Sequence, residues 1–236
     1  EPQFLHLLYR FLFTFFEVYY ITIPENMPKI CDALTSTFAK QDPTLIYPSI
    51  LFLQNAVSFE KQQQMREEET AIFPNISSEL APMIFESLLG IMINNIMETP
   101  PDEGSGQFNL SYEIVSYFKD INDLKGLIFD WLTQNFDSMI ESSEWKYRAA
   151  ALALVYCITS GPNFDDQVSF LMPRFGAILG KCQDQSLAVI DTSLWIIEKI
   201  FRTYQPIVSN NEYFGQIIHI VRNAQTAPLI LVIRVC

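Results

Sequence analysis

Three residues in the last quarter of the chain have types and a spacing suited to binding a positively charged segment. Asp191, Trp195 and Glu198 stand at positions i, i+4 and i+7, so a helix would place them on one face. An indole can take the aliphatic stem or ammonium group of Lys or Arg, while carboxylates take the charge. The pattern therefore predicts a basic-peptide site. The alternative is a tryptophan buried between neighbouring helices and flanked by two solvated acids.

Elsewhere the chain offers no set of residues with a catalytic or metal-binding spacing. His6 and His219 lie far apart, and the cysteines at positions 31, 157, 182 and 236 form neither a C-x-x-C motif nor a zinc pattern. Neither a P-loop nor a G-x-G-x-x-G fingerprint occurs. We therefore expect a binding protein that is not an enzyme and that uses no cofactor and no metal.

The charge of the chain restricts its partners. The 15 Lys and Arg residues against 27 Asp and Glu residues give a net charge of -12, so we expect no binding to nucleic acid, whose phosphates would be repelled. Residues 1–118 form the acidic half, with 5 basic and 15 acidic residues. The most apolar stretch, 80–97, contains Glu86, Asn94 and Asn95, so we expect no membrane insertion.

The elements that must position these residues are helices. Apolar residues recur at intervals of three and four, as at Ile30, Leu34 and Phe38, which is the period of a helix. Prolines and glycines interrupt the pattern, for example at Gly161-Pro162. The intervals predict a helix at 3–20 and antiparallel pairs at 25–40/44–66, 78–97/109–120, 123–141/144–160, 166–182/186–204 and 209–223/228–236.

A repeat connects two of these pairs. Segment 142–152 can be laid over segment 184–194, and in both a polar turn leads into a helix with small, apolar residues in its first turn. A period of about 40 residues with two helices per unit is typical of HEAT and armadillo solenoids. We therefore predict an all-α, right-handed HEAT-repeat α-solenoid, a single array over 1–236 of about five to six antiparallel pairs. Because the chain starts at Glu-Pro and ends inside an apolar run, we expect truncation at both ends.

The two repeat copies also carry a resemblance to a known family. Residues 144–151 read Glu-Trp-Lys-Tyr-Arg-Ala-Ala-Ala, and residues 184–195 read Asp-Gln-Ser-Leu-Ala-Val-Ile-Asp-Thr-Ser-Leu-Trp. This resembles importin β, the karyopherin β nuclear transport receptor, whose patterns are Asp-Trp-Arg-Tyr-Arg-Asp-Ala-Ala and Asp-Pro-Ser-Val-Val-Val-Arg-Asp-Thr-Ala-Ala-Trp. The resemblance implies that the helix with Trp195 lies on the concave surface, where the family binds the basic importin-β-binding segment of importin α or basic cargo.

The resemblance implies two further partners. Glu98, Asp102 and Glu103 stand where the family has an acidic loop for Ran-GTP or cargo, although the family's long aspartate run is reduced here to three acids. Residues 30, 34 and 38 lie on the first helix of a pair, the kind that receives Phe-Gly nucleoporins, but apolar residues at this spacing are also typical of a core. Such a receptor works in the cytoplasm, in the nucleus and at the nuclear pore in the nuclear envelope.

One aromatic and one basic residue near a predicted turn are expected to stabilise the fold. Trp145 can cap the helix hairpin, and Arg148 in the first helical turn can reach an aspartate of a neighbouring repeat.

A second function also stays open: a HEAT-repeat scaffold protein that organises other protein subunits. Such a scaffold would not need the stripe that Asp191, Trp195 and Glu198 form on one helix face.

Overall fold

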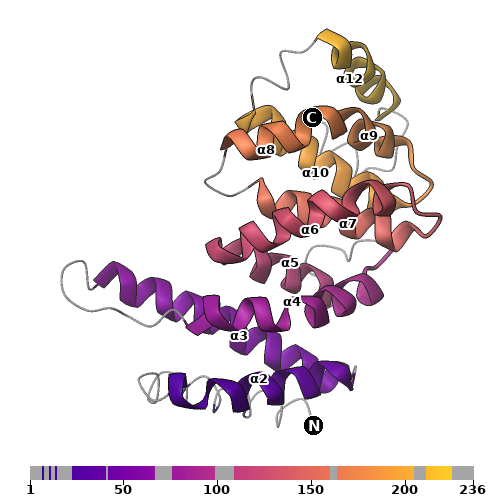
Figure 1. Ribbon diagram of the computed structural model, residues 1–236. Helices are drawn as coiled ribbons and strands as arrows, with labels where there is room; N and C mark the ends of the chain where they lie inside the picture. The colour runs from indigo at the N-terminus through magenta and orange to yellow at the C-terminus, as the bar shows by residue number, and fades with distance from the viewer. Residues whose placement is uncertain are drawn as a thin grey trace. The chain divides into compact units, whose positions relative to one another are not determined.

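The computed structural model describes residues 23–40, 42–66, 76–98, 109–159, 164–204 and 211–224, together with residues 7, 11 and 14. All regular elements in these ranges are helical, which confirms the all-α prediction for the described residues (Figure 1). They are α2 (Ile23–Ala39), α3 (Pro43–Arg66), α4 (Ile76–Asn95), α5 (Leu110–Asp120), α6 (Asn122–Ile140), α7 (Trp145–Ile158), α8 (Phe164–Leu171), η2 (Met172–Arg174), α9 (Phe175–Gly180), η3 (Lys181–Gln183), α10 (Leu187–Thr203) and α12 (Asn211–Ala224).

Most predicted helices begin and end within a few residues of the observed ones. The continuous helix predicted at 166–182 is wrong, because the 3-10 turn η2 separates α8 from α9. Pro173 lies in this turn, and a proline has no N–H for the helical hydrogen bond to the carbonyl four residues earlier. The helices predicted at 3–20 and 228–236 lie outside the described residues, except that residues 7, 11 and 14 are helical.

The chain divides into two compact units, and the division falls inside α6. The first unit comprises Glu1–Asn95 and Leu110–Leu127, and the second comprises Ile96–Asn109 and Ile128–Cys236. In each unit, first helices pack on first helices and second helices on second helices. This packing of helix pairs is that of an α-solenoid.

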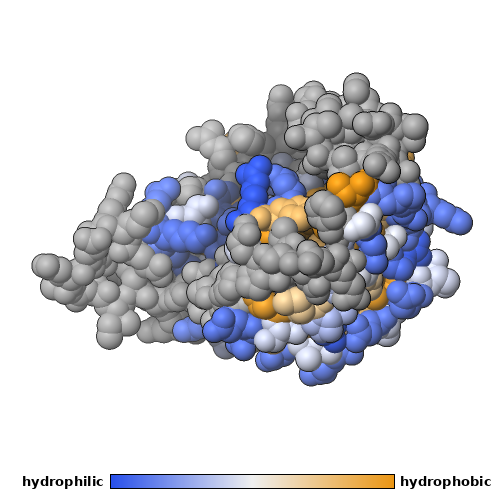
Figure 2. Space-filling model, turned by 90° about the horizontal axis from the view of Figure 1, so that it is seen from above, coloured by the Kyte–Doolittle hydropathy of each residue, from blue (hydrophilic) through white to orange (hydrophobic). Residues whose placement is uncertain are grey.

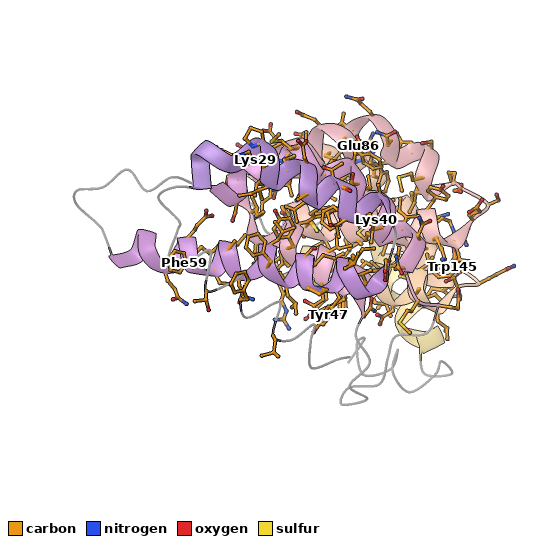
Figure 3. The ribbon with its side chains drawn as sticks, turned by 90° about the horizontal axis from the view of Figure 1, so that it is seen from below. Lys29, Lys40, Tyr47, Phe59, Glu86 and Trp145 are labelled. Atoms are coloured by element: carbon orange, nitrogen blue, oxygen red, sulfur yellow. The ribbon has the colours of Figure 1, made fainter. Side chains whose placement is uncertain are left out.

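In the first unit, α2 and α3 form one antiparallel pair. Figure 3 shows Lys29 and Phe59 toward one end of the pair, and Lys40 and Tyr47 toward the other. Helices α4 and α5 form the next pair, in which α4 packs against α2 and α5 packs against α3. Their interior is largely apolar, and its members include Leu34, Phe38, Ile50, Leu53, Ile84, Phe85, Leu88, Ile114 and Phe118.

The second unit is also built from packed helix pairs. Helix α7 packs along α10, and α9 packs against both α10 and α12. The Phe170 ring of α8 contacts Phe129 and Phe136 of α6, with ring centroids 5.6 and 5.7 Å apart. The run Ala149–Ala151 is 0–2% exposed, and its small side chains let α7 pack closely against its neighbours.

The surface of the described residues mixes hydrophilic and apolar groups. Figure 2 shows one face, on which hydrophilic residues lie beside patches of apolar ones. Met83 and Tyr112 are the most exposed apolar side chains of α4 and α5, at 55% and 54%. Among the described residues, no helix combines the length and the apolarity that a membrane crossing requires.

Candidate functional site

The candidate site is the outer surface of α7 and α10, two adjacent second helices of the second unit. Helix α10 carries all three residues of the predicted basic-peptide site. Its position depends on the turn that precedes it, where Asp184 and Ser186 lie. Contacts from α7 and from the segment after α4 hold that turn.

Arg148, in the first helical turn of α7, holds the turn that precedes α10. Its Nε and Nη2 donate to the two carboxylate oxygens of Asp184 at 2.8 and 2.7 Å, and its Nη1 donates to the carbonyls of Ser142 and Ser143. The backbone N–H of Ser186 donates to the same Asp184 carboxylate at 3.0 Å. The prediction that Arg148 reaches an aspartate of the neighbouring repeat is therefore confirmed.

The electrostatics of this pair follow from its burial. The two side chains are only 13% and 8% exposed, so water competes little for their hydrogen bonds. The hydrogen bonds to Asp184 raise the pKa of Arg148. Burial alone would raise the pKa of Asp184, but hydrogen bonds from Arg148 and from the Ser186 N–H outweigh burial and lower it. Both groups are charged near neutral pH, and the charges are matched.

Glu98 caps the start of α10. The first N–H groups of a helix have no partner inside the helix, and an acceptor or a negative charge there is stabilising. The side chain of Ser186, at the N-cap, makes no capping hydrogen bond. The Leu187 N–H donates instead to the Glu98 carboxylate at 3.2 Å, across 89 residues of sequence. Glu98 is therefore an internal helix cap, a role that sequence reasoning missed.

Trp195 lies at the junction of the two helices. Its ring centroid is 5.7 Å from that of Tyr156 on α7, with the ring planes at 40°. Both aromatic residues are half-buried, so each packs against protein and still presents surface to solvent. The burial of Trp195 is therefore intermediate between that of a core tryptophan and that of a tryptophan on an open binding surface.

The structure does not expose the two predicted acids equally. Asp191 is 8% exposed. Glu198 is exposed, and its carboxylate pairs with Arg202 at 2.7 Å. The exposed part of the predicted stripe thus consists of Trp195 and Glu198, and the basic-peptide role of all three residues stays a prediction.

Sequence reasoning also missed Tyr156 and Arg202. The repeat period could have found the first, because Tyr156 stands 42 residues before Glu198 and occupies the same place in the preceding second helix. Arg202 follows Glu198 by four residues, the usual spacing of a helical ion pair.

The other predicted sites are only partly described. Asp102 and Glu103 of the acidic loop lie outside the described residues. On α2, Leu34 and Phe38 are 7% and 2% exposed, and only Ile30 is half-buried. Leu34 and Phe38 are therefore core residues, because α2 turns this face toward the interior of the first unit. A nucleoporin contact at these positions stays a prediction with little surface to support it.

Within the described ranges, no group of three or more His, Cys, Asp and Glu side chains is arranged to hold a metal ion. His219 on α12 is exposed.

No family model and no curated protein matches the chain. Solved structures of importin β do match it, and three of them follow. Yeast importin-β (Kap95p) superimposes with a TM-score of 0.80 at 14% identity, Kap95p with RanGDP with 0.78 at 15%, and the Kap95:Nup1 complex with 0.76 at 15%. These matches cover 95–96% of this chain but 26–27% of the importin chains, so the chain spans about a quarter of their length. The likeness establishes the fold, an all-α helical repeat solenoid resembling the HEAT repeats of importin β.

Proposed function

We propose that the chain is part of an importin-β-like nuclear transport receptor that binds basic protein segments and is regulated by Ran-GTP. The basic segments are nuclear localisation signals or the importin-β-binding segment of importin α. Two observations support the proposal: the sequence resemblance of segments 144–151 and 184–195 to importin β, and the fold likeness over 95–96% of the chain. Such a receptor moves between cytoplasm and nucleus.

The observation that carries the proposal is the pair of aromatic rings on α7 and α10. A basic segment needs a surface that takes its aliphatic stems, and Trp195 beside Tyr156 offers two half-buried rings for them. Because the Arg148–Asp184 pair fastens the start of α10 to α7, the rings are held in place before a partner arrives. A preorganised surface loses less entropy on binding.

Two acidic groups lie on α10 or at its start. Glu198 is exposed three residues after Trp195, and Glu98 lies at the N-terminal end of the same helix. Glu98, the first acid of the predicted acidic loop, contacts the start of α10, and Asp102 and Glu103 follow it closely in the sequence. We propose that Ran-GTP or cargo contacts this segment through Asp102 and Glu103, since Glu98 is engaged as a cap.

The importin-β relatives also suggest the remaining partners. One of the matching structures is a complex with RanGDP and another is a complex with Nup1. For this chain, Ran-GTP and Phe-Gly nucleoporins are proposed partners on that basis.

The experiment is a pull-down of the 236-residue chain with immobilised Ran loaded with GTP or with GDP. A transport receptor should be retained by the GTP form and much less by the GDP form. The second candidate function, a HEAT-repeat scaffold, predicts no difference between the nucleotides. Equal retention on both forms, or none on either, contradicts Ran regulation and favours the scaffold.

A further inference from the structure

The charges that surround Trp195 on the exposed side of α10 are mixed, not uniformly acidic. Glu198 follows Trp195 by three residues, Lys199 by four and Arg202 by seven, so all three share one side of the helix. Glu198 and Arg202 are exposed, and Lys199 is half-buried. Asp191, the other acid of the predicted stripe, is 8% exposed. A partner that covers Trp195 therefore meets one exposed acid and two bases.

Glu198 already has a basic partner from its own helix. The Arg202 guanidinium lies 2.7 Å from the Glu198 carboxylate, and the two side chains are 76% and 49% exposed. An exposed ion pair at this spacing is weak, equivalent to about a two-fold population shift. A partner can therefore displace Arg202 from Glu198, but a displaced Arg202 then faces the partner as a free positive charge.

We propose that this surface selects a mixed-charge segment, in which a basic residue takes Glu198 while an acidic residue takes the released Arg202. The proposal rests on the proposed function and specifies its partner: a purely basic segment is not the best ligand of α10. Exchange of this one internal ion pair for two intermolecular ones leaves neither Glu198 nor Arg202 without a partner. A purely basic segment gains Glu198 but meets repulsion from Arg202 and Lys199, and such repulsion is what discriminates between related partners.

The helix geometry sets the spacing of the two charges. Glu198 and Arg202 are four residues apart, which is about 6 Å along a helix at 1.5 Å per residue. In an extended segment, residues two apart point to the same side and lie about 6.6 Å apart. The spacing that fits is therefore Lys/Arg-x-Asp/Glu or the reverse order, whereas adjacent opposite charges would point to opposite sides of the segment.

The test measures binding of fluorescein-labelled 11-residue peptides to the 236-residue chain by anisotropy at low salt, because salt screens exposed charges. Four peptides differ only at three central positions: Lys-x-Glu, Glu-x-Lys, Lys-x-Lys, and an isomer with adjacent Lys and Glu. We expect one of the first two peptides to bind about five-fold more tightly than Lys-x-Lys, since an attraction replaces a repulsion of similar size. The adjacent isomer should lose most of this advantage.

Two variants with the same change of net charge assign the effect to Arg202. Arg202→Gln should bring the ratio of affinities to about one or below, because the acidic residue of the peptide loses its partner. Lys199→Gln, which leaves the Glu198–Arg202 pair in place, should keep the preference for mixed charge. Equal responses of the two variants would indicate net charge alone and would overturn the proposal.

The remaining outcomes separate this inference from the proposed function. If Lys-x-Lys binds most tightly to the unaltered chain and binding falls in Trp195→Ala, the basic-segment function stands and the mixed-charge proposal is overturned. If no peptide binds, or if binding does not change in Trp195→Ala, both are overturned.

Discussion

Arg148 and Asp184 form a two-hydrogen-bond ion pair that joins the first turn of α7 to the turn before α10, with N–O distances of 2.7 and 2.8 Å. The pair holds together the helices that carry Tyr156 and Trp195. It is therefore the structural basis of the candidate site.

Arg148→Ala should destabilise the second unit by about 3 kcal/mol, because it leaves the largely buried Asp184 carboxylate without its counter-charge. Urea unfolding followed by circular dichroism measures this change. Arg202→Ala is the matched control, since it removes an arginine from an exposed pair and should cost less than about 1 kcal/mol. Equal losses in the two variants would contradict a special role for Arg148.

The same pair predicts how stability depends on pH. The folded-state pKa of Asp184 lies below its ordinary value of 3.8, so its stabilising effect is present above that value. The effect is lost as the pH falls through the lower folded-state pKa. Asp184→Asn should be less stable than the unaltered chain at pH 6, and the gap should narrow below about pH 4. Thermal melts of both proteins between pH 3 and 6 test this, and a gap that widens with acid would refute the assignment.

Glu98→Ala should loosen the first turn of α10. Loss of a helix cap costs about 0.5–2 kcal/mol, and the Leu187 amide should exchange with solvent faster. Hydrogen exchange followed by mass spectrometry measures the exchange rate of the Leu187 amide and the loss of stability of the first turn. Glu144 is the control, because it stands at the N-cap of α7 without a side-chain capping bond, so Glu144→Ala should leave the first turn of α7 unchanged. Unaltered exchange at Leu187 in Glu98→Ala would argue against the cap.

Local patterns in the sequence were sufficient for the fold. Helical periodicity and proline punctuation predicted nearly all described helices, because both act over a few neighbouring residues. Pro173 was the exception: the apolar period continues through it, whereas the structure has the 3-10 turn η2 there. The Arg148–Asp184 pair was predictable because the repeat period places one residue opposite the other.

The site was less predictable, because it depends on contacts between distant segments and on burial. The contact of Glu98 with Leu187 spans 89 residues, and no local pattern indicates it. Spacing placed Asp191, Trp195 and Glu198 on one face, but spacing does not tell how much of that face its neighbours cover. The same limit applies to Leu34 and Phe38, whose helical period fits a core and a surface equally well.

Calorimetric titration of an importin-β-binding peptide into the unaltered chain and into Trp195→Ala tests whether Trp195 binds a basic segment. We expect the peptide to bind the unaltered chain, and the variant to lose about 0.5–2 kcal/mol of binding free energy, the range for cation–π contacts. Because Trp195 is only half-buried, the variant should also unfold with less than the roughly 3–5 kcal/mol loss typical of a core aromatic. Unchanged peptide affinity in a folded Trp195→Ala variant would contradict the claim.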